Sequence, residues 1–206
     1  MSVARLDGGV NIAGMGFPIH ISVSDEGGIG QEVTVPKAYA GNLSTRTSAT
    51  AGVFTTTSTH NLDVGDFFDF YFADGVAYNC EVTVETDTTI TFTGGTGTDG
   101  DGGEALPLAT TTGQVGERKV ITTAFLGTAV SAVAAYCSVG RGHIAFIDTA
   151  VAELTVDIAD GEGWFWIEGL GYANPITGDD IDEIWVSTAD TIADRTFYVG
   201  VQYDSV

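Results

Sequence analysis

Short stretches in which apolar and polar residues alternate occur along most of the chain. Residues 20–25 and 31–38 alternate in this way, and the glycine-rich residues 27–30 between them predict a turn. Further stretches are rich in the Thr, Val, Phe and Tyr that suit a pleated sheet. They are GVFTTTS, DFFDFYF, NCEVTVET, TTITFTG, KVITTAFLG, AVSAVAAYCSVG, GHIAFID, ELTVDIADGEGWFWIEG, DEIWVSTAD and RTFYVGVQYDS. The sequence therefore predicts an all-β protein.

Helical periodicity is nearly absent from the same chain. No stretch keeps an apolar period of 3.6 residues between capping signals, so we expect little or no helix. The alanine-rich residues 129–135 are the one place where a short helix would fit.

The spacing of strands and turns indicates the domain organisation. Short strands separated by turn sequences from about residue 41 to 109 predict a small β-barrel or sandwich. Because strand patterns also open and close the chain, we expect residues 1–40 and 110–206 to form an outer β-sandwich, with 41–109 as an insertion. Two β domains in series, 1–109 and 110–206, are the alternative.

Charge is the bulk property that most restricts the partners expected for this chain. The chain has 28 acidic and 7 basic residues, a formal charge of −21. This charge repels nucleic acid and anionic membranes, so we expect neither as a partner. The amino terminus lacks the pattern of a signal peptide, and no apolar run is long enough to span a bilayer as a helix. We expect the chain to be made in a cytoplasm.

Residues with catalytic potential form no recognisable motif. Cys80 and Cys137 stand in apolar stretches, where a free cysteine packs as a small hydrophobe. The three histidines are scattered, and His60 is predicted to form hydrogen bonds in a turn. Residues 95–100 match the spacing G-x-G-x-x-G, but an acidic glycine-rich loop rather than a helix follows them. We therefore expect no enzyme activity and no cofactor.

Two acidic clusters are weak calcium candidates, because calcium prefers hard oxygen ligands. The first is Asp99, Asp101 and Glu104 on a glycine-rich loop, and the second contains Asp179 and Asp180, followed by Asp182 and Glu183. Neither has the spacing of a twelve-residue EF-hand loop. A solvated acidic loop is the simpler interpretation of both.

The aromatic residues near the carboxyl end are candidate interface residues. In a strand, Trp164 and Trp166 share one face and Phe165 takes the other. One face is expected to fill the core and the other to pack on a neighbouring sheet or subunit. Trp185 and Tyr172 complete the candidate set, for which carbohydrate stacking is the alternative.

Three segments together resemble structural proteins of tailed bacteriophages and prophages that have not been characterised. Residues 41–83 have a threonine-rich strand, the turn H-N-L-D-V-G-D, an aromatic strand and a D-G hairpin. Residues 159–190 contain the W-x-W strand and the loop N-P-x-x-G-D, and residues 195–206 end on Y-D-S. The chain departs from the pattern at Asn61, where glycine is frequent, and at residues 72–74, where a tryptophan is common.

The resemblance implies a virion component assembled in the host cytoplasm. The function expected from it is that of a capsid decoration (cement) or head-surface protein. Its partners would be copies of itself, as in a trimer, and other virion proteins such as the major capsid protein. A tail or neck component and a receptor- or glycan-binding β module are the alternatives.

Overall fold

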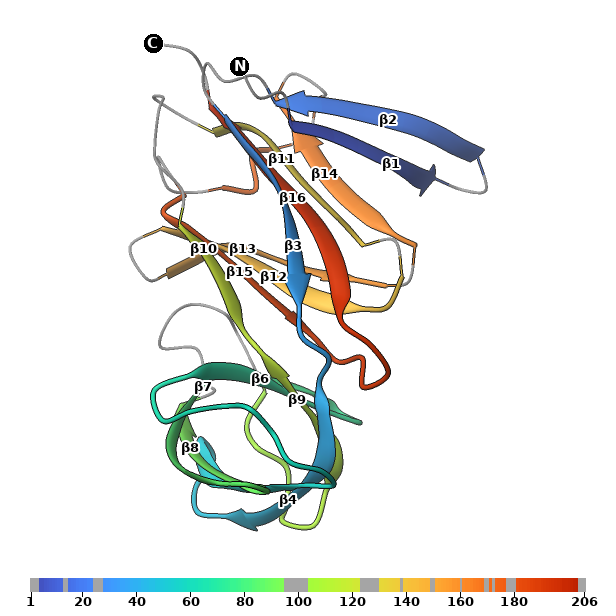
Figure 1. The fold of residues 1–206 in the computed structure, drawn as a ribbon. Coiled ribbons are helices and arrows are strands. Elements are labelled where there is room, and N and C mark those ends of the chain that lie inside the picture. The colour runs from blue at the N-terminus through green and yellow to red at the C-terminus, as the bar shows by residue number, and fades with distance from the viewer. Residues whose placement is uncertain are drawn as a thin grey trace. The chain divides into compact units, whose positions relative to one another are not determined.

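Every regular element in the computed structural model of the chain is a β-strand (Figure 1). The structure describes residues 4–12, 15–23, 28–94, 104–122, 130–137, 139–148, 151–159, 161–168, 171, 173–176 and 181–203. Within these ranges there is no helix, and the predicted all-β class is confirmed.

The chain divides into two compact units. The sheet unit consists of Met1–Thr34, Lys119–Val186 and Arg195–Val206, and the barrel unit of Val35–Arg118 and Ser187–Asp194. The barrel unit therefore includes residues 35–40 and 110–118, which the sequence analysis assigned to the outer sandwich. The reason is that one barrel strand begins in the first stretch, at Tyr39, and another, Thr112–Glu117, lies entirely in the second.

Six antiparallel strands close the barrel in the order β4-β5-β8-β7-β6-β9. Their bounds are β4 (Tyr39–Arg46), β5 (Ala51–Thr56), β6 (Phe67–Phe72), β7 (Gly75–Thr86), β8 (Thr89–Gly94) and β9 (Thr112–Glu117). Alternate residues of β5 and β8 are buried, as expected for strands with one face on a core.

Phenylalanine rings fill the barrel. Phe54 packs edge-on against Phe70, and Phe68 against Phe92, with 5.2 Å between the ring centroids in each pair. All four rings are almost completely buried. Burying each contributes about 1.5–3 kcal/mol, and edge-to-face pairing adds roughly 0.5–1.5 kcal/mol per pair. The interior is thus a packed core.

Glycines in β4 and β9 make room for these rings. A Cβ at Gly41 would stand 2.7 Å from the ring of Phe54, and one at Gly113 would stand 2.5 Å from the ring of Phe70. Both would also lie within 2.3 Å of a backbone oxygen of the neighbouring strand. The strands predicted from the sequence do not include residues 112–117, because TGQVGE has little of the β-branched and aromatic content that marks a strand.

Two four-stranded sheets form most of the sheet unit. One has the order β10-β15-β12-β13 and the other β14-β11-β16-β3. The first contains β10 (Lys119–Thr122), β15 (Glu183–Thr188), β12 (Gly142–Asp148) and β13 (Val151–Ile158). The second contains β14 (Gly163–Ile167), β11 (Val130–Cys137), β16 (Arg195–Tyr203) and β3 (Gly28–Val35). A hairpin of β1 (Ala4–Ile12) and β2 (Met15–Val23) forms a separate two-stranded sheet.

Two local predictions are wrong. The alanine-rich stretch suggested for a short helix belongs to β11, where Val133 and Ala135 are buried and pair with β14 and β16. Burial against two neighbouring strands outweighs the helix preference of alanine. Residues 28–30, expected in a turn, are the first residues of β3. Glycine has no side chain to disfavour the extended backbone, so it does not end a strand by itself.

Candidate functional site

The predicted calcium ligands fall mostly outside the described residues, as Asp99, Asp101, Asp179 and Asp180 do. Glu104 is described: its backbone nitrogen donates to the carbonyl of Val76 at 2.8 Å, and its side chain lies where a Cβ on Gly75 would stand. Of the second cluster, Glu183 accepts a hydrogen bond from the indole nitrogen of Trp185 at 2.7 Å. In the described part of the chain, no three His, Cys, Asp or Glu residues gather as a metal site.

The register of β14 shows which face of this strand is the core. Trp166 pairs with Val133 and Trp164 with Ala135, and the same face continues on β16 at Val199 and Val201. Trp166 is only 6% exposed, and both valines of β16 are fully buried. Trp166 therefore belongs to the core together with these valines, whereas Trp164 on the same face is half-buried.

The opposite face of the same strands carries a second set of aromatic side chains. Phe165, Tyr136 and Tyr198 are each half-buried, and we call these three residues the aromatic face. The rings of Tyr136 and Tyr198 pack together with centroids 6.1 Å apart. On this face, Phe165 pairs with Ala134 of β11, and Ala134 pairs with Gly200 of β16. Aromatic side chains thus stand around small residues.

The other two interface candidates differ in how far they can be placed. Trp185 is half-buried on β15 and pairs with Val120 of β10, which is 50% exposed. An exposed apolar side chain beside a tryptophan is typical of a contact surface. Tyr172 lies outside the described residues.

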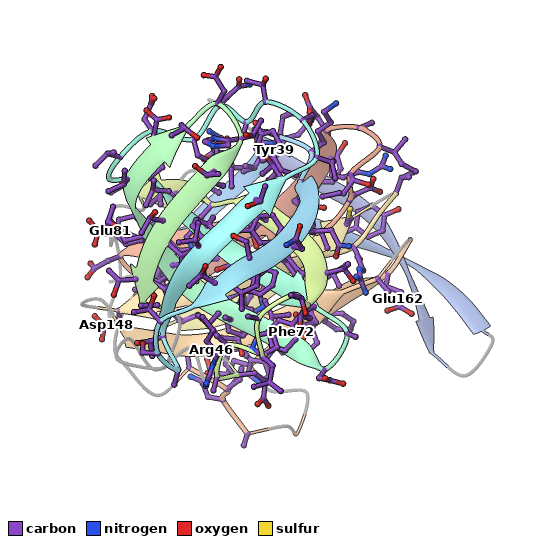
Figure 2. All side chains as sticks on the ribbon, turned by 90° about the horizontal axis from the view of Figure 1, so that it is seen from below. Tyr39, Arg46, Phe72, Glu81, Asp148 and Glu162 are labelled. Carbon is purple, nitrogen blue, oxygen red and sulfur yellow. The ribbon has the colours of Figure 1, made fainter. Side chains whose placement is uncertain are left out.

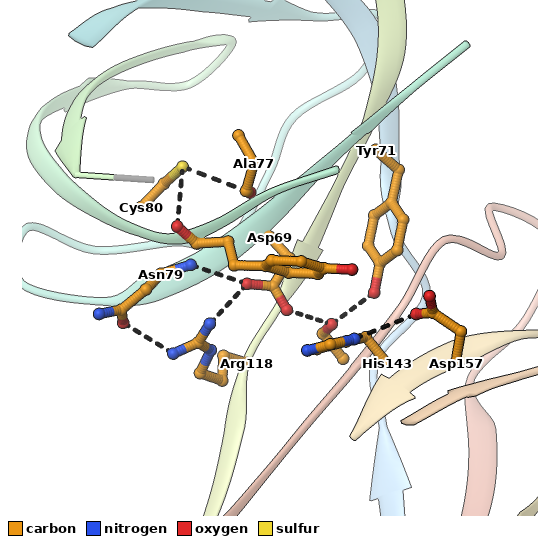
Figure 3. A network of polar contacts seen from close by, with 10 residues as sticks. Asp69, Tyr71, Ala77, Asn79, Cys80, Arg118, His143 and Asp157 are labelled. Carbon is orange, nitrogen blue, oxygen red and sulfur yellow. Dashed lines mark hydrogen bonds and ion pairs between the residues drawn. The ribbon is translucent and has the colours of Figure 1, made fainter. Parts of the chain in front are cut away.

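A buried polar cluster in the barrel unit connects three distant parts of the chain (Figure 3). Asp69 of β6 is 1% exposed and Arg118 is 7% exposed, and their side chains form an ion pair at 2.6 Å. The second carboxylate oxygen of Asp69 accepts a hydrogen bond of 2.5 Å from the hydroxyl of Ser187. Because that hydroxyl has a single proton, it accepts the hydrogen bond of 2.5 Å from Tyr71.

A β-bulge in β7 completes this cluster. Phe68 pairs with Cys80 and Phe70 with Ala77, so two residues of β7 stand opposite Asp69. One of them, Asn79, has a φ of 56°, its backbone nitrogen donates to Asp69 at 2.9 Å, and its side-chain oxygen accepts from Arg118 at 2.7 Å. Asparagine tolerates this left-handed conformation better than most residues.

The hydrogen bonds of the buried polar cluster hold segments of the barrel unit together. A serine between a carboxylate and a tyrosine has the residue types of a nucleophile site, but Ser187 is 1% exposed. Its hydroxyl is held between Asp69 and Tyr71. The hydroxyl is therefore shielded from solvent. The cluster instead binds the segment Ser187–Asp194 to β6, and the backbone bond from Ala38 to Asp190 supports this segment further along.

Two histidines, His60 and His143, have side-chain contacts with polar groups. The Nδ1 of His60 accepts from the backbone nitrogen of Leu62 at 3.3 Å, and its Nε2 lies 3.3 Å from the carbonyl of Thr89. The predicted role in turn hydrogen bonding is confirmed. In the sheet unit, His143 is 3% exposed and its Nδ1 lies 3.1 Å from the carboxylate of Asp157, which is 76% exposed.

The two cysteines also lie in the interior of the protein. Cys80 and Cys137 are both fully buried and unbridged, which confirms their prediction as core residues.

No helix among the described residues is long and apolar enough to cross a membrane. Comparisons with protein-family models, with curated proteins and with solved structures found no match to this chain.

Proposed function

We propose that this chain is a structural protein of a tailed-phage virion, with the role of a capsid decoration (cement) or head-surface protein. It would stabilise the particle through contacts between subunits rather than by catalysis. The resemblance of residues 41–83, 159–190 and 195–206 to phage structural proteins is the source of this assignment.

The observation that carries the assembly role is the aromatic face next to a strand edge. The strand β14 is the outer strand of its sheet: among the described strands it pairs only with β11, and the hairpin strand β1 lies near it without pairing. An outer strand offers unpaired backbone groups to a neighbouring chain. Phe165 stands on this strand and is half-buried, so side-chain burial and strand pairing are available at one place.

Charge and buried chemistry support the same role. A net charge of −21 suits a surface that faces solvent, since a surface lining packaged DNA would meet polyphosphate repulsion. Every member of the buried polar cluster is used within the fold, which supports a protein without a catalytic centre there. A tail or neck component would use the same contacts, so it remains the alternative within the virion class.

Replacement of Phe165 by Ser tests the assembly role. We expect the variant to lower the sedimentation coefficient of the purified chain and the rupture temperature of the parent particle. Phe72→Ser is the matched control, because Phe72 is also half-buried but lies in the barrel unit. Tyr198→Ser repeats the test from β16, which β11 separates from β14 in the same sheet. Assembly of both aromatic-face variants at the wild-type level, with an unchanged fold by circular dichroism, would contradict the proposal.

Glycan binding is the second candidate. The pair Tyr136 and Tyr198 favours it, because half-buried aromatic rings are suited to stacking on sugars. A glycan array with wild-type protein and Tyr136→Ala separates the two functions. Binding that the substitution abolishes would replace the assembly proposal for this face, whereas a silent array supports it.

A further inference from the structure

Among the described residues of the barrel unit, three exposed apolar side chains gather on the outside of the barrel. Val64, Phe67 and Val84 are 63%, 41% and 57% exposed. Backbone hydrogen bonds place them together, since Gly65 donates to the carbonyl of Val82 and Val82 donates to that of Asp66. Val64 and Phe67 lie on either side of Gly65 and Asp66 in the chain, and Val84 lies two residues after Val82 on β7. We call these three residues the barrel patch.

Acidic residues surround the barrel patch. Asp63 and Asp66 belong to the turn that carries Val64, while Glu81 pairs with Phe67 across β6 and β7 and Glu85 follows Val84. Glu81 lies on the outer surface of the barrel (Figure 2). The patch is therefore an apolar centre within a negatively charged rim.

Basic residues of the barrel unit do not neutralise this rim within the described part of the unit. Arg118 is buried in its ion pair with Asp69, and Arg46 is on β4, which β5 and β8 separate from β7. Lys37 precedes β4, and its backbone nitrogen donates to Asp194. A second copy of the chain would bring the same acidic rim against this one, which like-charge repulsion disfavours.

We propose that the barrel patch is a docking surface for a different protein, one whose apolar contact residues are surrounded by lysine and arginine. The barrel is closed, so it has no strand edge to offer and must bind through outward side chains. Val64, Phe67 and Val84 supply the buried centre of such a contact, and the rim sets its charge specificity. The proposal does not depend on a virion role and concerns the other unit from the aromatic face.

A synthetic heptapeptide that alternates lysine with valine and phenylalanine is the probe. We expect it to bind the full chain, and to bind about tenfold more weakly after the triple substitution V64S/F67S/V84S. The control is L108S/I192S, which removes two other exposed apolar side chains of the barrel unit. Raising NaCl from about 50 to about 500 mM should weaken binding, because exposed charges are screened.

Two further peptides separate this site from simple attraction to an acidic chain. In the first peptide, serine replaces the valine and phenylalanine residues. It should bind the wild type as weakly as the original heptapeptide binds the triple variant. The peptide with glutamate in place of lysine should not bind. Equal binding of the lysine and valine peptide to the wild type, the triple variant and the control, or no binding to the wild type, would overturn the proposal.

The acidic rim has a test of its own. E81Q/E85Q should weaken binding of the cationic peptide and should increase self-association in sedimentation velocity, because the barrier between copies falls. Self-association of the wild type that V64S/F67S/V84S abolishes would instead make a second copy the occupant and overturn the choice of partner. F165S should leave both the peptide binding and the effect of E81Q/E85Q unchanged. A failure of the docking proposal is therefore distinguishable from a failure of the proposed assembly role.

Discussion

The barrel unit and the sheet unit deal with strand edges in different ways. In the barrel every described strand has two antiparallel neighbours, so all edges are used internally. In the sheet unit the two larger sheets end at β10, β13, β14 and β3 among the described strands. Closure removes sites for pairing with other chains, whereas open sheets retain them. The two units are thus suited to different contacts: side-chain docking on the barrel and strand pairing on the sheets.

The units also differ in how they use buried charge. The barrel contains a nearly dry ion pair between residues 49 positions apart, with a serine from 118 positions away bound to the same carboxylate. In the sheet unit, the buried His143 lies instead against the exposed carboxylate of Asp157. A buried pair is costly to break but is not in itself a source of net stability. We infer that the barrel pair fixes which segments meet and contributes little to the total free energy.

The largest expected effect comes from breaking this pair. Arg118→Met should lower the free energy of unfolding of the barrel unit by about 3–5 kcal/mol, because it leaves the carboxylate of Asp69 buried without its cation. Urea unfolding followed by hydrogen exchange of barrel peptides measures the loss. Since all three tryptophans lie in the sheet unit, tryptophan fluorescence reports the other unit in the same experiment.

The control for Arg118→Met is a double replacement. Asp69→Leu together with Arg118→Met removes both charges, and we expect it to cost clearly less than the single change. Asp74→Asn, at an exposed turn residue, should stay within about 0.5 kcal/mol of the wild type. A single and a double variant of equal stability would show that the charge left behind is not the cause.

Much of this fold could be predicted from the sequence, because it depends on local pattern. Alternation in GVFTTTS and TTITFTG gives β5 and β8, and the sequence around His60 gives its turn bond. The polar cluster could not be predicted, since Asp69, Arg118 and Ser187 meet only after the barrel closes. The one available signal was a lone aspartate within the apolar stretch FFDFYF, where a buried charge requires a partner.

The same limit applies to the aromatic candidates. Periodicity separates Trp166 from Phe165 by face, but it does not say which face is the core. Pairing of Trp166 with Val133, and of Val133 with Val201, decides this, and such register is a long-range property. Residue type alone favoured the tryptophans as interface residues, although the smaller Phe165 stands on the opposite face from the buried Trp166.

An intermediate effect is expected at the bulge. Asn79→Ala should destabilise the barrel unit by about 1–3 kcal/mol, since it puts an ordinary side chain at a φ of 56° and removes the acceptor for Arg118. Asn79→Gly separates the two causes, because glycine tolerates the backbone but also lacks the acceptor. We expect glycine to recover part of the loss in chemical denaturation. If glycine is no better than alanine, backbone strain has no role.

The smallest effect should come from the tyrosine at the end of the cluster. Tyr71→Phe removes only the hydroxyl that lies 2.5 Å from that of Ser187, and Ser187 keeps its own bond to Asp69. We expect a loss of about 0.5–1.5 kcal/mol, the net value of one hydrogen bond. Tyr198→Phe, at a half-buried tyrosine of the sheet unit, is the matched change and should cost less, because that ring has access to water. In a double-mutant cycle, Tyr71→Phe and Ser187→Ala should couple, as residues in one hydrogen-bond network do. Additive losses would mean that the two hydroxyls act separately, and within the cluster Ser187 would then be held by its bond to Asp69 alone.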